Sequence, residues 1–217
     1  MPQDSGGASI GPVRATGAAG RWLWAILAVL WLGGTATGLY LLWAWDNKPG
    51  ASAKARDQWP AESRLARDYG RPTLVMLVHP QCTCSRASLS ELAELLARAH
   101  PRPKTYVLFL KPAGFSDGWE QTDLWRTASA LKDVTVLRDD EGVQAARFGG
   151  ATSGQTFLYD ARGALQFSGG ITAARAHAGD NAGRSAIVAL VNGSGPATTR
   201  TSVFGCPLFD RPPAGGL

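Results

Sequence analysis

Hydrophobic and polar positions divide the chain into one long apolar segment near the N-terminus and a later region in which short apolar runs alternate with amphipathic ones. The apolar segment, residues 22–45, contains no charged side chain. A helix of that length, at about 1.5 Å per residue, spans a hydrocarbon core of about 30 Å, and Trp and Tyr gather toward its ends as interfacial aromatics do. The pattern predicts a membrane anchor. The alternative is a cleaved signal peptide with its cleavage site at 51–53, although signal-peptide apolar regions run only about 7–15 residues.

After residue 68 the pattern alternates between strand-like and helix-like segments. Strands are expected at 74–79, 105–110, 134–137, 155–159 and 164–168, and helices at 84–99, 123–132, 141–148 and 181–191. The turn sequence at 160–163 predicts a hairpin between the last two strands. Parallel β-α-β units followed by an antiparallel hairpin predict an α/β domain, with a mixed sheet covered by helices on both faces.

The same reading divides the whole chain into segments. Residues rich in Gly, Ala and Ser come first, and polar residues with Pro and Gly follow the anchor. We expect a disordered cytoplasmic tail at 1–21, a transmembrane anchor at 22–45, a stalk at 46–68, the α/β domain at 69–195 and a C-terminal tail at 196–217.

Composition narrows the range of partners. The net charge of +5 is spread along the chain without a run of Lys or Arg, so we do not expect nucleic acid as a partner. The sequence has neither a Gly-x-Gly-x-x-Gly pattern nor a phosphate loop, so no organic cofactor is predicted.

The most informative local feature is Cys82-Thr83-Cys84, which lies where a strand-like run meets a helix-like run. A helix N-terminus favours the thiolate, which is the form of cysteine that attacks disulfides or binds soft metals. The third cysteine is Cys206, which either exchanges with this pair, completes a thiolate site, or is an unreactive cysteine of the tail. Paired thiols on an anchored domain suit an oxidising space, so we expect a single-pass protein of the bacterial inner membrane with its C-terminal domain in the periplasm.

Around these cysteines the chain resembles the thioredoxin-like family, in its membrane-anchored branch of thiol-disulfide oxidoreductases associated with cytochrome maturation. In that family a strand ends at Cys-x-x-Cys, and the helix continues with a basic residue and a Leu-x-x-Leu stripe. When Leu89–Leu92 is aligned on the stripe, Cys82 falls on the attacking cysteine and Arg86 on the basic residue. Ser85 then occupies the place of the second cysteine, and Cys84 comes one residue early. The resemblance implies a thioredoxin-like fold after one transmembrane helix.

Two departures from the family pattern bear on function. The family usually carries a cis-proline before the first hairpin strand, whereas this chain has Gln155 at that place. A disulfide between residues two apart closes a small, strained ring, and strained disulfides are the more oxidising and labile ones. The overall layout, including Phe204–Leu208, also resembles RedB-like proteins.

We therefore predict thiol-disulfide exchange with a partner protein's thiols or disulfides. Cys82 attacks as the thiolate, Cys84 resolves the mixed disulfide, and Cys206 exchanges with them. His79, His177 and the helix N-terminus tune the thiol pKa values, and Arg86 either holds the thiolate or only covers the end of the helix. The alternative for His177 is a solvent-exposed loop histidine. The predicted site is Cys82, Cys84, Cys206, His177, His79 and Arg86.

The alternative is a binding protein without redox turnover. Soft thiolates select Cu(I), and thiols that no cis-proline protects are open to a metal. Under this alternative the protein is a copper chaperone or sensor that binds the metal through Cys82, Cys84 and His177. The oxidoreductase hypothesis needs no cofactor, and the alternative needs copper.

Overall fold

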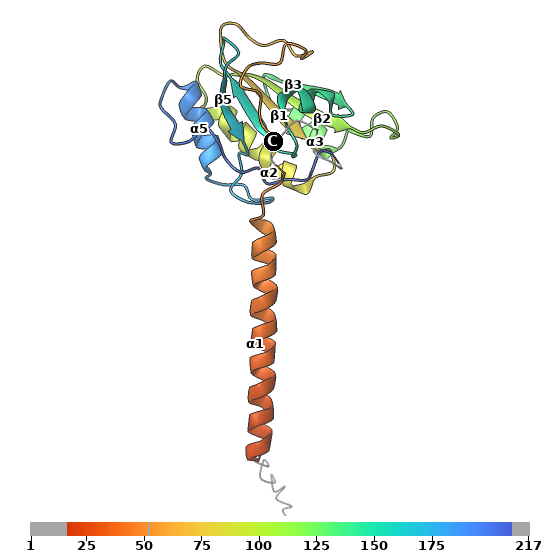
Figure 1. Cartoon of the computed structure of the whole chain (residues 1–217), viewed down its shortest axis with the longest axis vertical. Helices are drawn as coiled ribbons and strands as arrows, with labels where there is room; N and C mark the ends of the chain where they lie inside the picture. The colour runs from red at the N-terminus through yellow and green to blue at the C-terminus, as the bar shows by residue number, and fades with distance from the viewer. Residues whose placement is uncertain (1–16, 52, 210–217) are drawn as a thin grey trace, which may run out of the picture. The chain divides into compact units, whose positions relative to one another are not determined.

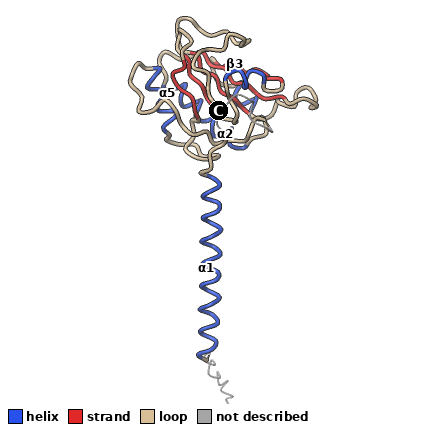
Figure 2. The backbone as a smooth tube through the Cα atoms, viewed as in Figure 1, coloured by secondary structure: helices blue, strands red, loops and turns tan. Residues whose placement is uncertain are grey.

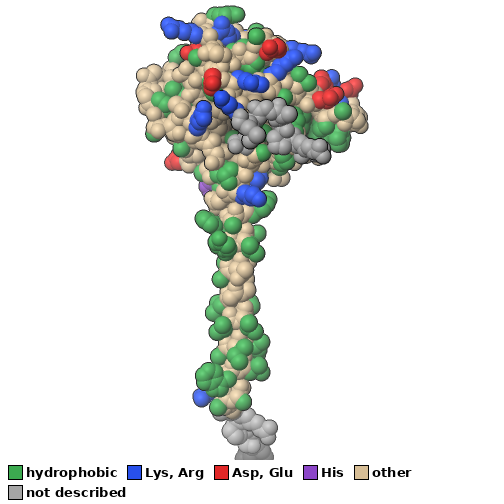
Figure 3. Space-filling view, viewed as in Figure 1, with side chains coloured by type: hydrophobic (Ala, Val, Ile, Leu, Met, Phe, Trp, Pro, Cys, Tyr) green, Lys and Arg blue, Asp and Glu red, His purple; other side chains and the backbone are tan. Residues whose placement is uncertain are grey.

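The computed structural model describes residues 17–51 and 53–209, which divide into an N-terminal unit ending at Trp45 and a compact unit that begins at Asp46. The N-terminal unit is the helix α1, Ala18–Asp46, whose side chains are all outside any core. Apolar side chains cover it along its length (Figure 3). It is long and apolar enough to cross a membrane, a requirement that a signal sequence also meets. The predicted tail lies outside the described residues as far as position 16, and its last residues belong to α1.

The described part of the compact unit contains one mixed sheet with the strand order β3-β2-β1-β4-β5 (Figure 1). The first three strands are parallel, and the last two run antiparallel as a hairpin. The strands are β1 Thr73–Val78, β2 Lys104–Lys111, β3 Val134–Asp140, β4 Thr156–Tyr159 and β5 Leu165–Gly169, and the helices are α2 Thr83–Arg98, α3 Asp123–Ser129, α4 Val143–Phe148 and α5 Ala182–Val191. The predicted thioredoxin-like α/β fold, preceded by one apolar helix, is confirmed.

A hydrophobic core lies on each face of the sheet, because alternate residues of a strand point to opposite faces. Leu74 and Met76 of β1 pack beneath α2 and α5, which contact each other. The leucine stripe of α2, including Leu89 and Leu92, is buried in this core as its spacing predicts. On the other face Val75 packs with residues of α4 and the hairpin. Strand β1 is buried from end to end, so its C-terminal end is a rigid support for whatever follows it.

Loops and turns lie around the sheet of the compact unit (Figure 2). The region 46–68, for which the sequence predicts a stalk, packs on the domain along much of its length. Trp59 lies edge-on against Phe148 and Tyr159, with ring centroids 5.0 and 5.3 Å away, and its N–H donates to the Gly163 carbonyl. Trp59, the single aromatic residue of this largely polar segment, is the sequence signal for this packing.

Three connecting segments meet at the C-terminal end of β1. Helix α2 starts there, and antiparallel β4 begins beside it, because Met76 pairs with Thr156. The Leu77 N–H donates to the Gln155 carbonyl, and the Leu77 carbonyl accepts from Gly154. Strand β5 ends near the C-terminal end of β1 as well, since Gly169 pairs with Thr156. The loops before β4 and after β5 therefore approach the start of α2.

Candidate thiol site

Cys82 is the N-terminal cap residue of α2 and has extended backbone angles. Its N–H donates to the His79 carbonyl, and its own carbonyl accepts from Ser85, at 3.1 and 3.0 Å. Cys84 follows in the first turn, and only 1% of Cys82 and 6% of Cys84 is exposed. The first turn of a helix offers unpaired N–H groups and the positive end of the helix dipole, so a negative sulfur is stabilised there.

Cys206 brings a third thiol to the same place, and all three thiols are free. Burial pushes the pKa of Cys82 upward, but hydrogen bonds from Cys206 and Ser85 outweigh burial and leave that pKa below its ordinary value. Burial and the donated hydrogen bond raise the pKa of Cys206 to about 12. Burial and the neighbouring Cys82 charge also raise the pKa of Cys84. Of the three, Cys82 is the thiol that most readily becomes a thiolate.

The C-terminal tail holds Cys206 in position through its backbone. The Ser153 N–H donates to the Cys206 carbonyl at 2.8 Å, and the Leu208 N–H donates to the Ala151 carbonyl at 2.9 Å. An antiparallel bridge joins the residues between these two bonds. Gly205 lies so close to the Ser153 carbonyl that an added Cβ would be 2.0 Å from its oxygen. The tail is thus paired like a short strand with residues 151–153.

Ser153 links this strand pairing to the start of α2. Its hydroxyl accepts a hydrogen bond from the His79 N–H. It also lies 2.7 Å from the Ser85 hydroxyl, and these two hydroxyls share a buried hydrogen bond. Gln155, which stands where the family usually has its proline, is buried and accepts from the Ala151 N–H through its side chain at 3.0 Å. Hydrogen-bonded polar side chains, rather than a proline, shape the loop that faces the thiols.

Arg175 is the arginine that reaches a thiol. Its guanidinium donates to the Gly205 carbonyl at 2.9 Å, and its hydrogen bond to Cys84 lowers the pKa of that thiol against the larger effect of burial. Arg86 instead pairs with Asp123 at the surface, where more than half of its side chain is exposed. The sequence predicted Arg86 because it falls on the basic residue that follows the second cysteine in the family it resembles. That reasoning missed Arg175, which lies in a loop far from the cysteines in sequence.

The two histidines of the predicted site occupy different environments. His79 is half-buried, and burial lowers its pKa, so its ring is neutral near pH 7. Its ring accepts from the Gln81 N–H at 3.2 Å and lies edge-on to Trp119, 5.7 Å away. His177 is exposed, although the neighbouring Ala176 N–H bonds to Cys84. The loop therefore lies near the thiols as its topology predicts, while the His177 side chain faces solvent.

The described residues contain no group of three or more His, Cys, Asp or Glu side chains placed to hold a metal ion. Cys82, Cys84 and His177 accordingly do not form a ready-made ligand set within 17–51 and 53–209. Copper binding through these residues stays a prediction.

A buried ion pair holds the loop that carries Arg175. Glu91 of α2 pairs with Arg184 of α5, both almost fully buried, and accepts from the Gly179 N–H at 2.7 Å and the Asn181 amide at 3.0 Å. Helix α2 begins at Thr83, so Glu91 lies well inside the helix and serves in tertiary packing.

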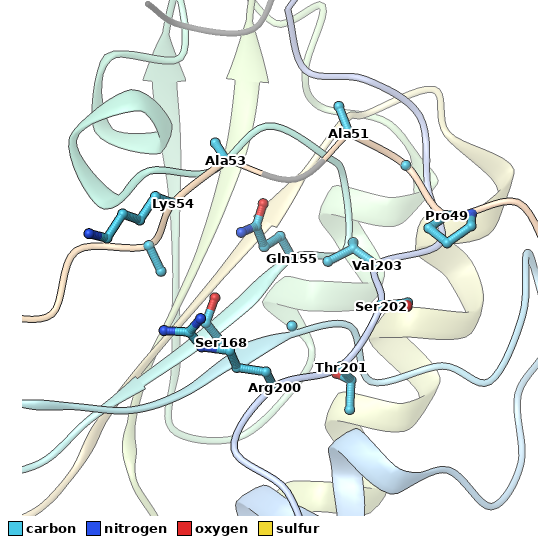
Figure 4. Close-up of a pocket in the computed structure, with 13 residues that line it drawn as sticks. Pro49, Ala51, Ala53, Lys54, Gln155, Ser168, Arg200, Thr201, Ser202 and Val203 are labelled. Atoms are coloured by element: carbon cyan, nitrogen blue, oxygen red, sulfur yellow. The ribbon is translucent and has the colours of Figure 1, made fainter. Parts of the chain in front are cut away.

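Two hollows border the tail. One, of about 410 Å³, lies beside His79 and is lined partly by Pro207, Leu208 and Phe209. The other, of about 630 Å³, lies on the far side of the tail between β5 and the segment after α1. Figure 4 shows this second hollow, with Lys54, Ser168 and Arg200 among its lining residues. Only the first hollow adjoins a residue of the predicted site.

Comparisons with known proteins identify the fold and no more. No family model matches the chain, and no curated protein matches it. A hypothetical protein from Sinorhizobium meliloti is 21% identical, with a TM-score of 0.51, over 74% of this chain and 93% of its own. An uncharacterized conserved protein from Geobacillus kaustophilus is 17% identical, with a TM-score of 0.53, over 77% of this chain and 95% of its own.

A secreted disulfide oxidoreductase from Mycobacterium tuberculosis, described as homologous to DsbE of Escherichia coli, superposes less well. It is 20% identical, with a TM-score of 0.34, over 44% of this chain and 66% of its own. The two better-matched structures share the architecture of the compact unit, so the comparisons agree with the thioredoxin-like fold seen in its strand order.

Proposed function

We propose that the protein is a thiol-disulfide oxidoreductase in which Cys82 is the attacking thiolate. The observation that carries this proposal is the placement of the three free thiols: Cys82 caps the N-terminus of α2, Cys84 lies in its first turn, and the Ser153 pairing holds Cys206 beside them. In keeping with this placement, the pKa of Cys82 is lowered, whereas the pKa values of Cys84 and Cys206 are raised. A lowered pKa at a helix N-terminus is the usual property of a nucleophilic cysteine, and thiols with raised pKa values stay protonated until they are needed.

The exchange consumes no cofactor. The Cys82 thiolate attacks one sulfur of a partner's disulfide, forms a mixed disulfide and releases the partner's other sulfur as a thiolate. A second thiol of this protein loses its proton and attacks the Cys82 sulfur, which frees the partner as a dithiol. Two electrons pass to the partner, and an internal disulfide remains here. The sequence assigns this second step to Cys84. In reverse, the same steps oxidise a partner dithiol.

Anchoring by α1 restricts the reaction to partners at a membrane surface. The apolar helix fits a single-pass anchor, and a disulfide carrier is useful where disulfides persist. The proposal therefore places the compact unit in the periplasm of a bacterium, in the membrane-anchored and RedB-like branch that the sequence resembles.

The test uses the full chain in detergent with a small disulfide-bonded protein as the probe. A Cys84→Ser/Cys206→Ser double variant has no thiol with which to resolve, so it should accumulate a mixed disulfide at Cys82, detected by non-reducing electrophoresis and peptide mapping. The matched control adds Cys82→Ser to the same background. The proposal fails if the double variant traps no partner, or if the triple variant traps as much.

A further inference from the structure

The start of α2 faces two thiols, and their surroundings differ in a way that decides which one bonds to Cys82. Cys84 sits inside the first helical turn, which is closed by the hydrogen bond from Ser85 N–H to the Cys82 carbonyl. Its thiol hydrogen-bonds to the Cys82 sulfur, and its sulfur also bonds to the Ala176 N–H and to Arg175 of the loop after β5. A bridge between positions 82 and 84 would form a strained ring inside this turn, because disulfide geometry is narrow.

Cys206 approaches Cys82 from outside the helix. Its thiol also hydrogen-bonds to the Cys82 sulfur, so both thiols neighbour Cys82, and the difference between them is that Cys206 belongs to a separate segment and not to the helical turn. Its backbone is fixed on both sides, by the Ser153 N–H bond to its carbonyl and by the Arg175 bond to the carbonyl of Gly205. The tail can therefore move the Cys206 sulfur toward the Cys82 sulfur while the first turn of α2 stays intact.

The tail is built to dock along its length and not only at the cysteine. The Thr201 hydroxyl donates to the Gly170 carbonyl at 2.7 Å, and the Gly50 N–H donates to the Val203 carbonyl at 2.8 Å. Gly169 and Gly170 lie so close to the tail backbone that an added Cβ on either would come within 2.7 Å of it. Glycine at such contacts allows two backbones to approach closely. The whole segment returns Cys206 to one place.

We infer that Cys206, and not Cys84, is the resolving thiol, so that the redox-active disulfide of this protein is Cys82–Cys206 and its formation ties the C-terminal tail across the start of α2. This inference rests on the proposed function. In the resolving step the Cys206 thiol loses its proton and attacks the Cys82 sulfur of the mixed disulfide. The Cys82–Cys206 bond forms, the bond from Cys82 to the partner breaks, and the partner leaves as a thiolate that takes up the proton.

The inference also assigns a movement to the tail. Cys82 is almost fully buried while the tail is docked. A partner's sulfur that bonds to Cys82 needs the place that the Cys206 thiol occupies, so the tail must withdraw for attack and return for resolution. Cys84 then takes no part in the exchange.

The test compares two matched single variants of the full chain in detergent, Cys84→Ser and Cys206→Ser, with oxidised glutathione as the probe. Wild type and Cys84→Ser should form one internal disulfide, mapped by mass spectrometry to Cys82 and Cys206. Cys206→Ser should stop at the glutathione adduct of Cys82 and resolve roughly 100-fold more slowly, since a docked thiol acts at an effective concentration far above that of external thiols.

Mapping the wild-type disulfide keeps the result independent of how well a variant folds. A wild-type bond between Cys82 and Cys84, or an adduct that persists in Cys84→Ser and not in Cys206→Ser, overturns the assignment of Cys206 while the proposed function stands. Failure of Cys82 to form any adduct in any variant removes the proposed function and this inference together.

Discussion

Replacing Gly205 with alanine is expected to weaken docking of the C-terminal tail without touching any cysteine. The new Cβ would lie 2.0 Å from the Ser153 carbonyl oxygen, whereas real Cβ atoms essentially never come within 3.0 Å of a neighbour. The two backbones must therefore separate by about 1 Å. That shift stretches the 2.8 Å bond from Ser153 to the Cys206 carbonyl past the limit of about 3.5 Å for a hydrogen bond.

The expected magnitude follows from the bonds that this separation affects. The bond to Cys206 and the neighbouring bond from Leu208 to Ala151 each contribute about 0.5–1.5 kcal/mol. Losing both bonds makes the free energy of tail docking less favourable by about 1–3 kcal/mol, which lowers the equilibrium constant for docking roughly 5- to 150-fold. The assay is the effective concentration of Cys206 toward Cys82, measured in glutathione redox buffers with a Cys84→Ser background.

Gly195→Ala is the matched control for this prediction. It makes the same chemical change upstream of the docked segment, where an added Cβ meets nothing within 4 Å. In this control, the effective concentration of Cys206 toward Cys82 should equal that of the Cys84→Ser background without a glycine substitution. An effective concentration in Gly205→Ala that matches the control would refute the reasoning, because the observed backbone approach would then not be holding Cys206 at Cys82.

Three further outcomes are expected. Glu91→Gln removes the buried carboxylate that pairs with Arg184 and leaves this buried arginine with only the exposed Asp180 as an ionic partner, so it should destabilise the protein by about 3–5 kcal/mol in urea unfolding. Glu94→Gln, which removes an exposed pair on the same helix, should cost about 1 kcal/mol or less. Because hydrogen bonding from Cys206 lowers the pKa of Cys82, Cys206→Ala should move the midpoint of the pH profile for Cys82 alkylation upward; an unmoved midpoint would contradict the stated cause. His177→Ala should leave the rate of thiol exchange unchanged, since this side chain is exposed, and a parallel Cu(I) titration would test the copper alternative.

The fold was predictable because its signals are local. Strand β1 is a continuous apolar run, and α2 shows its leucine stripe within a few turns, so both could be placed with the thiols between them. The hairpin of β4 and β5 was marked by its turn residues at 160–163. Periodicity over ten to fifteen residues carries that information, and it was sufficient to locate Cys82 and Cys84 at the start of a helix.

The surroundings of the thiols were less predictable, because they are made by loops that meet only after folding. Nothing near Arg175 in the sequence distinguishes it from Arg86, and its contact with Cys84 depends on where β5 ends. The role of Glu91 depends in the same way on partners that lie in and beside another helix. One sign in the sequence indicated that the tail docks beside the thiols, which is Gly205 directly before Cys206. The role of this glycine became clear only from the position of the Ser153 carbonyl.

Burial of the nucleophile gives the tail two opposing effects on the reaction. With the tail docked, Cys82 is 1% exposed, so attack on a partner must wait for the tail to leave, whereas resolution must wait for the tail to return. Gly205→Ala shifts the tail toward the open state and should therefore speed formation of the mixed disulfide while slowing its resolution. Single-turnover measurements with a disulfide probe, at a pH where Cys82 is fully ionised, separate the two steps. If both rates fall together, the substitution has damaged the site, and the tail does not control access to Cys82.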